Sequence, residues 1–238
     1  MNDLAINLLA SVIAGTAVWL AQRLLRYRRT SRRRAFLGLV PGAPVLIVVG
    51  RHASSPAAMS VNKADVAAVL DLAVLVKEAG AEPTIALHTE AADGVGERVE
   101  FCVGGPESNQ RTAAHLRWLL PGFTQAPYAE DPEGLSLRVG TRVFRREPGS
   151  CEYVLLARVF AAGRPRPLFL VCGQTAVSNH AATRYLVNQQ HRLRSSYGTN
   201  ASFCLILRIV NSASYGSGVV ELVADVTAAT MAGSGSPL

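Results

Sequence analysis

RVEFCVGGPESNQRTAAHL, residues 98–116, decides the fold class of this chain. An apolar run ends in two glycines, and a proline and an asparagine then lead into an alanine-containing segment. This order is typical of a buried strand, a tight turn and the capped start of a helix. Residues 169–186, FLVCGQTAVSNHAATRYL, show the same order. The sequence therefore predicts an α/β domain assembled from strand–turn–helix units.

The segments around these two units continue the alternation of strands and helices. VLIVVG at 45–50 is an apolar run rich in β-branched residues, typical of a strand buried on both faces. Apolar residues then recur at helical spacing from Lys63 to Ala79, and Gly80 closes that helix. The elements expected in the first half are strands over 45–50, 83–88 and 98–105 and helices over 63–79 and 109–120.

The second half of the chain carries antiparallel signals. Residues 135–147 alternate apolar and polar side chains around Gly140-Thr141, which predicts a hairpin. The further elements expected are strands over 151–162, 167–173, 202–210 and 218–226, a helix over 178–194 and a flexible tail over 229–238. We expect a Rossmann-like mixed sheet with flanking helices over residues 45–228. Its strands are expected to be parallel among 45–50, 98–103 and 167–172 and antiparallel from 135 to 162.

The N-terminus carries an uncharged apolar run. Leu4 to Ala21, eighteen residues, spans roughly 27 Å as a helix, close to the thickness of a bilayer core. Asp3 precedes the run and arginines follow it, the reverse of the charge order in a cleaved signal peptide. We therefore predict a single transmembrane anchor over residues 1–22 and a basic juxtamembrane linker over 23–44. An amphipathic helix lying on the membrane surface is the alternative, which the lack of a polar face disfavours.

The positive charge of the chain is local. The net charge is +7, and seven arginines lie within residues 23–34. Outside residues 1–34 the chain has 17 basic and 16 acidic residues, so the body is near neutral. This argues against a nucleic-acid-binding domain, whose basic residues spread over the folded face. Arginines beside a span stay on the cytoplasmic side and contact anionic lipid headgroups there. We predict a single-pass protein of the cell membrane whose C-terminal domain is cytoplasmic.

Cysteines and small residues add two expectations. Three of the four cysteines lie inside apolar strand-like runs: Cys102, Cys172 and Cys204. No pair of cysteines has C-x-x-C spacing, which predicts buried thiols in a reducing compartment and no metal site. Ala10, Ser11, Ala14 and Gly15 place small side chains on one face of the anchor, and this permits close packing of two helices in a homodimer.

Three predicted strands end in glycine-containing turns, which are the candidate binding loops. In open α/β sheets, ligands bind beyond the carboxyl ends of the strands, beside helix N-termini. Glycine lets backbone approach a ligand, and free N–H groups at a helix start favour an anion. The candidate ligand-binding residues are Gly50, His52, Gly104, Gly105, Glu107, Asn109, Gly173, Thr175 and Asn179. The ordinary interpretation stays open, since any such turn uses Gly, Ser and Asn as turn and cap residues.

Signals of catalysis are weaker. The chain has no H-E-x-x-H, G-x-S-x-G, P-loop or G-x-G-x-x-G pattern. Glu107, His52 and His180 lie at the candidate loops and are the side chains to consider for acid–base work. The GGP turn followed by Asn109 resembles nucleotide-handling Rossmannoid proteins, such as nucleoside deoxyribosyltransferase-like domains, over this short stretch. The resemblance implies a nucleotide-like ligand.

We therefore expect a membrane-anchored cytoplasmic binding or sensor domain for a small, nucleotide-like ligand. Two alternatives stay open. One is a membrane-tethered N-glycosidase or deoxyribosyltransferase-like enzyme, and the other is a structural interaction protein without a small ligand. The sequence names no cofactor and no catalytic residue, so it leaves open whether the protein catalyses a reaction.

Overall fold

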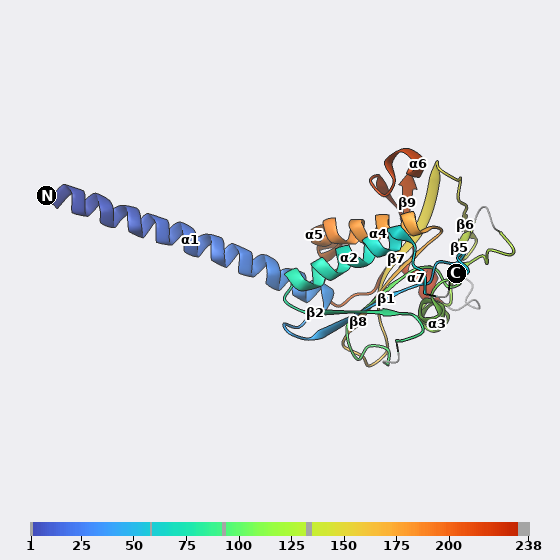
Figure 1. Ribbon diagram of the computed structural model, residues 1–238. Coiled ribbons are helices and arrows are strands. Elements are labelled where there is room, and N and C mark those ends of the chain that lie inside the picture. Colours follow the sequence, from blue (N-terminus) through green and yellow to red (C-terminus); the bar gives the residue numbers. More distant parts are fainter. Residues whose placement is uncertain (1, 58, 92–93, 132–134, 233–238) are drawn as a thin grey trace.

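The structure, a computed structural model, describes residues 2–57, 59–91, 94–131 and 135–232, with the side chains of helix α1 (Asn2–Leu37) described from Ile13 on. Helix α1 projects from one end of a body that holds the sheet and the other helices (Figure 1). The helix is continuous across residue 22, so the predicted anchor and much of the predicted linker over 23–44 form one element.

A seven-stranded mixed sheet forms the centre of the body, in the order β10-β9-β7-β8-β3-β1-β2. Its strands are β1 (Pro44–Val49), β2 (Glu82–Leu87), β3 (Glu100–Val103), β7 (Cys151–Phe160), β8 (Pro167–Gly173), β9 (Phe203–Val210) and β10 (Val220–Asp225). Strands β2, β1, β3 and β8 pair in parallel, which confirms the parallel pairing expected among 45–50, 98–103 and 167–172. Strand β7 is antiparallel to both β8 and β9, so β9 runs in the direction of β8.

The hairpin expected around Gly140-Thr141 forms, but it lies outside the main sheet. Strands β5 (Leu137–Val139) and β6 (Arg142–Phe144) pair with each other, and β4 (Phe123–Gln125) joins them in a separate antiparallel sheet. The expectation that the whole of 135–162 contributes antiparallel strands to one sheet is therefore wrong. The hairpin strands have only three residues each, and their apolar side chains pack on the main sheet instead of extending it.

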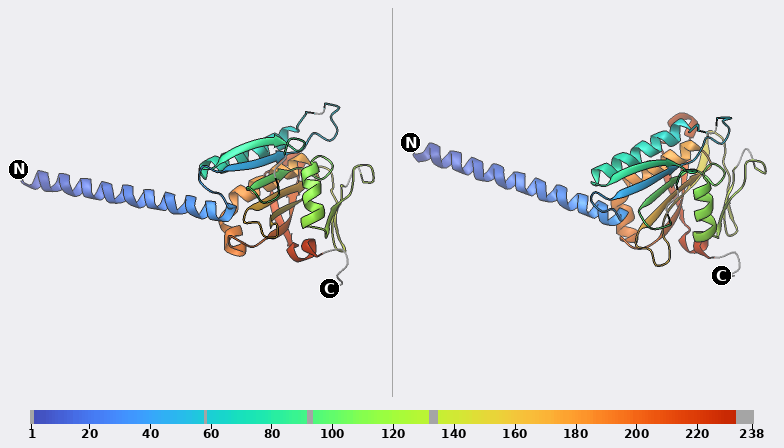
Figure 2. Two further views of the ribbon diagram at one scale, coloured as in Figure 1. Left: turned by 90° about the horizontal axis from the view of Figure 1, so that it is seen from below. Right: turned by 60° about the horizontal axis from the view of Figure 1, so that its bottom comes forward.

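Helices cover both faces of the main sheet. On one face lie α2 (Lys63–Glu78), α4 (Ala176–Asn188) and α5 (Gln190–Tyr197), with α2 and α4 side by side (Figures 1 and 2). On the other face lie α3 (Gln110–Leu119), α7 (Thr227–Met231) and the small sheet. Strand β1 shows why two layers form: Val45, Ile47 and Val49 pack in the first core, and Leu46 and Val48 pack in the second.

Two C-terminal elements differ from expectation. The helix expected over 178–194 is two helices that meet at Gln189, whose backbone leaves the helical range with φ −100° and ψ 14°. The break turns α5 so that Leu193 packs in the core. The tail expected over 229–238 begins as helix α7, while residues 233–238 lie outside the described part of the chain. A short helix, α6 (Ser212–Tyr215), links β9 to β10.

The C-terminal turns of α1 belong to the folded body. Phe36 and Leu37 are buried in the core beneath α2 and α5. The Arg34 guanidinium donates from Nε to the Ala79 carbonyl at 2.5 Å, and Arg33 pairs with Glu78 at 2.5 Å. These contacts tie α1 to the end of α2.

The transmembrane prediction is not supported by the fold. Within the residues described, no helix combines enough length with enough apolar character to cross a membrane. The side chains of residues 4–12, half of the predicted span, lie outside the described set. The membrane span therefore stays a prediction.

Candidate functional site

A cavity of about 550 Å³ lies at the carboxyl ends of β1, β3 and β8. The chain leaves β1 and β8 toward α2 and α4 on one face of the sheet, and it leaves β3 toward α3 on the opposite face. Because these connections diverge, a crevice opens above β3. Open α/β sheets bind ligands in crevices of this kind. The loops that follow all three strands line the cavity, as the sequence predicts for one shared binding edge.

The candidate residues divide into two groups. Those that line the cavity are His52, Gly105, Glu107, Gly173, Thr175 and Asn179. Gly50, Gly104 and Asn109 lie behind this surface and serve the packing of the loops. A Cβ on Gly50 would lie 2.8 Å from the Ser108 carbonyl oxygen, so the turns after β1 and β3 touch at that glycine. Gly104 has φ +114°, which a residue with a side chain rarely adopts.

Asn109 is a helix cap and not a surface ligand-binding group. The side chain is fully buried. Its Oδ1 accepts hydrogen bonds from the amides of Arg111 and Thr112, both at 3.1 Å, and its Nδ2 donates to the Val103 carbonyl at 3.0 Å. Both acceptor positions of Oδ1 and one of the two Nδ2 hydrogens are therefore used inside the turn. The ordinary interpretation of this asparagine, as an N-cap, is the correct one.

The turn after β8 is held by two side chains that also face the cavity. Thr175 caps α4 in a capping box with Ser178, and its hydroxyl donates to Glu152. Asn179 accepts a hydrogen bond from the Gly173 amide at 2.8 Å and donates to Asp65 Oδ1 at 2.9 Å. Asn179 thus joins the end of β8 to the start of α2, which lie far apart in the sequence.

Asp65 is a cavity residue that the sequence analysis missed. It lies in the first turn of α2, two residues after the helix starts, and it is only 8% exposed. Burial raises the pKa of the Asp65 carboxyl, although the hydrogen bond from Asn179 and the nearby His52 and His180 oppose this. Its position after an Asn62 N-cap in the loop that follows β1 was the available signal.

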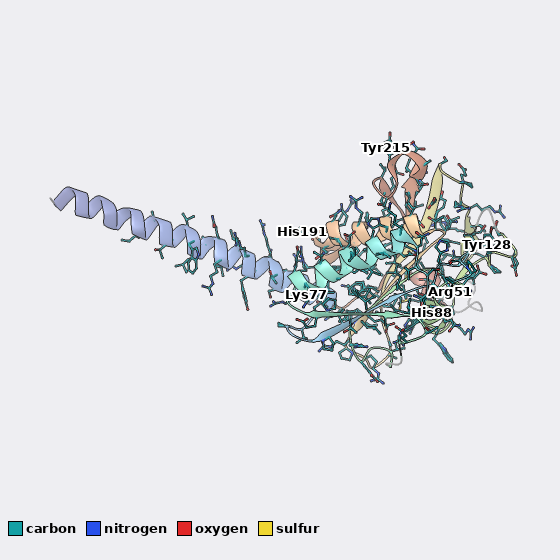
Figure 3. The ribbon with its side chains drawn as sticks, viewed as in Figure 1. Arg51, Lys77, His88, Tyr128, His191 and Tyr215 are labelled. Carbon is teal, nitrogen blue, oxygen red and sulfur yellow. The ribbon has the colours of Figure 1, made fainter. Side chains whose placement is uncertain are left out.

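Four polar residues lie around the opening of the cavity: Arg51, His52, Glu107 and Tyr128. Arg51 and Tyr128 lie at the end of the body that is remote from α1 (Figure 3). Glu107 accepts a hydrogen bond from the Tyr128 amide at 2.8 Å, so the segment after β4 closes over the turn after β3. His52 contacts Ser54 Oγ and Asn62 Nδ2, each at 3.3 Å. These contacts place two titratable side chains and one guanidinium around the opening.

His180 does not join His52 across the cavity. Its Nε2 lies 3.0 Å from Asp71 Oδ2 on α2, and its Nδ1 lies 3.2 Å from Ser217 Oγ. His180 is therefore a link between α4, α2 and the segment after α6. Of the two histidines considered for acid–base work, His52 lines the cavity and His180 does not, because residue 180 is a full turn into α4 and its ring contacts Asp71 and Ser217.

Two glutamines, also missed, fix the wall that the small sheet supplies. Gln174 accepts from the Tyr153 amide at 2.7 Å and donates to the Phe144 carbonyl at 3.0 Å. Gln125 donates to the Gly173 carbonyl at 3.2 Å. Both side chains connect the β4–β5–β6 sheet to the main sheet at the carboxyl end of β8. No sequence pattern marks them, because their partners are distant in the chain.

Within the described chain, one group of side chains has the spacing of metal ligands: Glu100, Cys102 and His115. Arg111 already donates to both carboxylate oxygens of Glu100, at 2.5 and 2.7 Å. A guanidinium there repels a cation and occupies the oxygen atoms that would bind it. The chemistry of this cluster therefore fits a buried ion pair and does not fit a metal centre.

No family model matches the chain, and no curated protein shows significant sequence similarity to it.

Proposed function

We propose that the protein is a membrane-anchored binding or sensor domain for a small, nucleotide-like ligand held at the carboxyl edge of the sheet. The observation that carries the proposal is the crevice above β3, formed where neighbouring connections leave on opposite faces. Its volume of about 550 Å³ lies in the range of small-molecule sites, roughly 300–1,000 Å³.

The lining favours a ligand rich in hydroxyl groups over a highly charged one. Arg51 is the only arginine or lysine that lines the described cavity, and Asp65 and Glu107 are carboxylates. Carboxylates accept hydrogen bonds from sugar hydroxyls, while a single arginine at the mouth suits one phosphate group. A nucleoside or nucleoside monophosphate has this combination of groups.

An enzymatic function is the second candidate, and Asp65 favours it. A buried carboxyl whose pKa is raised, in contact with a cavity, has the properties of a proton donor or acceptor. An N-glycosidase or deoxyribosyltransferase-like reaction on the same ligand class would use such a group. Glu107 lies at the same opening as a second carboxylate.

A panel of nucleosides and nucleotides tests the binding proposal on the full chain in neutral detergent. We expect a saturable thermal shift with at least one member and a weakening of about tenfold for Asp65→Asn, the loss expected for one hydrogen bond to a charged group. Asn at position 65 still accepts from Asn179, so the fold is retained. Asp71→Asn, on the same helix but outside the cavity, is the matched control and should bind normally.

Chromatography of the same mixtures separates the candidates. Unchanged ligand with a thermal shift supports a binding or sensor domain, and consumed ligand supports the enzyme. If no member of the panel shifts the melting temperature, the crevice is not a nucleotide site and the structural interaction protein is favoured.

The anchor is supported by the exposed surface of α1. Val18, Trp19 and Leu20 follow one another, so they point in three directions around the helix, and each is more than half exposed. Ile13 and Leu25 are exposed as well. A helix that is apolar all round needs a bilayer or another helix to cover it. Anionic headgroups beside the arginines of 23–34 and a homodimer through residues 10–15 would both follow from such an anchor.

Membrane insertion is tested by extraction and by fusions. We expect the full chain to stay in membranes washed with alkaline carbonate. A green fluorescent protein fused after Leu238 should fluoresce, and alkaline phosphatase at the same place should be inactive, because arginines stay on the cytoplasmic side. Neutral residues at Arg23, Arg26, Arg28 and Arg29 with lysines added before Leu4 should weaken or invert this orientation. Release by carbonate would contradict the span, and an active wild-type phosphatase fusion would contradict the orientation.

A further inference from the structure

A second cavity, of about 610 Å³, lies at the opposite end of the body, where α1 meets α4 and α5. His191 marks this end in Figure 3, and Arg51 marks the end that holds the crevice. Five arginines and one histidine line this second cavity: Arg26, Arg29, Arg32 and Arg33 of α1, and His191 and Arg194 of α5. We call this the basic cavity.

The charge of the basic cavity is not balanced within the chain. Glu78 is the only carboxylate among its described lining residues, and it pairs with Arg33 at 2.5 Å. In the part of the protein that the structure describes, the other four arginines form no ion pair. Four like charges around one concave surface repel one another, so the arrangement is stabilised by an anion that enters it.

The arrangement depends on the fold and not only on the arginine-rich composition of 23–34. Arg26, Arg29 and Arg33 recur at spacings of three and four, which places them on one side of α1, facing α5. Arg28 lies one helical turn before Arg32 and does not line the cavity. Arg194 lines the cavity from α5. Guanidinium groups on two helices can donate hydrogen bonds to one anion from two sides.

The helix ends themselves contribute little. The first turn of α5 presents partial positive charge, and its N-cap, Gln189, makes no side-chain cap hydrogen bond. The last turn of α4, one residue earlier, presents partial negative charge of similar size, about half an elementary charge. The two nearly cancel, so the side chains of the two helices determine the sign of the site.

We propose that the basic cavity binds a small anion with two or more phosphate groups, either free or as a lipid headgroup. A terminal phosphate carries a charge of about −1.5 to −2 and a lipid phosphodiester about −1, so two or more phosphates neutralise much or all of the charge of the four arginines. The planar guanidinium donates two parallel hydrogen bonds to phosphate oxygens, which suits this ligand. Arg26 lies about 8 Å and Arg33 about 18 Å along the helix beyond Ala21, so the site begins at headgroup depth and extends beyond it.

The first test measures the binding of inorganic pyrophosphate and triphosphate to the full chain in neutral detergent by calorimetric titration. This arm does not depend on whether α1 spans a bilayer or on any ligand of the crevice. We expect saturable binding that weakens about a hundredfold in Arg29→Gln/Arg194→Gln, since each arginine supplies a charge-assisted contact. Arg23→Gln/Arg28→Gln removes the same charge from outside the cavity and should weaken binding by about threefold or less. Circular dichroism checks that all variants fold.

The second arm assigns the source of the phosphate. The chain is placed in nanodiscs of three compositions: phosphatidylcholine alone, phosphatidylcholine with cardiolipin, and phosphatidylcholine with phosphatidylglycerol. Cardiolipin carries two phosphates, and the last two compositions have the same total lipid charge. Loss of pyrophosphate binding with cardiolipin but not with phosphatidylglycerol shows that a lipid headgroup fills the cavity. Unchanged binding in all three shows that the ligand is a free anion. Equal losses in the two double variants would overturn the proposal. The absence of saturable pyrophosphate and triphosphate binding, both in detergent and in phosphatidylcholine nanodiscs, would overturn it as well.

Discussion

Replacing Arg158 with alanine is expected to lower the free energy of unfolding by about 4 kcal/mol, the scale for stranding buried partners of a charged group. Arg158 lies on β7 and is fully buried. Its guanidinium donates to the carbonyls of Phe36 at 2.9 Å, Gly198 at 3.1 Å and Ala201 at 2.6 Å. Alanine leaves these carbonyls without donors and opens a cavity.

Arg158 joins three parts of the protein that are distant in sequence. The bonds reach the end of α1, the turn after α5 and the segment before β9. The guanidinium also lies over the rings of Phe36 and Phe203, 4.6 and 5.1 Å from their centroids. Burial lowers the pKa of Arg158 to about 10, which leaves the group charged at neutral pH. Loss of this side chain should therefore also loosen α1 from the body.

Thermal unfolding of the full chain in one detergent, followed by circular dichroism, measures the effect. A loss of about 4 kcal/mol corresponds to a fall in melting temperature of about 8–16 °C for a chain of this size. Arg158→Met separates the loss of hydrogen bonds from the opening of a cavity, because methionine fills most of the volume but donates no hydrogen bond. Arg208→Ala, on the neighbouring strand β9, removes an exposed arginine paired with Glu221 and should change little. Equal melting temperatures for Arg158→Ala and Arg208→Ala would show that the buried network does not stabilise the fold.

Arg158 also shows what sequence analysis misses. In CEYVLLARVF a single arginine in an apolar strand is read as a solvent-facing residue, since nothing nearby in the sequence pairs with it. Its acceptors are backbone carbonyls, which every residue carries and no pattern marks. The break at Gln189 is hidden for a similar reason, because no glycine or proline stands there.

The strands and the sheet edge that holds the cavity could be predicted because their signals are local. The apolar run of β1 and the glycine turns after β1, β3 and β8 follow from residue types within a few positions. Parallel order then brings the three turns together. The cavity wall was not predictable, since Asp65 meets Asn179 across 114 residues and Gln125 meets Gly173 across 48. The membrane span and the ligand stay predictions that the experiments above test.

Because of the ion pair between Glu100 and Arg111, the free energy of unfolding is expected to fall as the pH is lowered into the acid range. Burial alone would raise the pKa of Glu100, but hydrogen bonds from Arg111, His115 and Cys102 lower it from 4.5 to about 2. Because the folded pKa lies below the unfolded one, the stabilisation is present above pH 4.5 and is lost as the pH falls toward 2. The shift corresponds to about 3 kcal/mol at neutral pH, and Glu100 is only 2% exposed, so solvent screens it little.

Glu100→Gln mimics the protonated carboxyl and isolates this contribution. The variant should unfold with about 3 kcal/mol less free energy than wild type at pH 6, because Arg111 loses its buried partner. The difference should shrink steadily below pH 4.5, because the carboxyl of the unfolded wild-type chain takes up a proton there while the folded one stays ionised until about pH 2. Denaturant titrations at several pH values give the difference at each pH and remove the effect of the other carboxyls, which both proteins share. Glu221→Gln, in an exposed pair on β10, is the matched control and should change the free energy of unfolding little at pH 6. If the difference in free energy of unfolding between wild type and Glu100→Gln is the same at pH 2.5 as at pH 6, Arg111 does not hold the carboxyl ionised. The interpretation of the cluster as a buried ion pair would then be wrong.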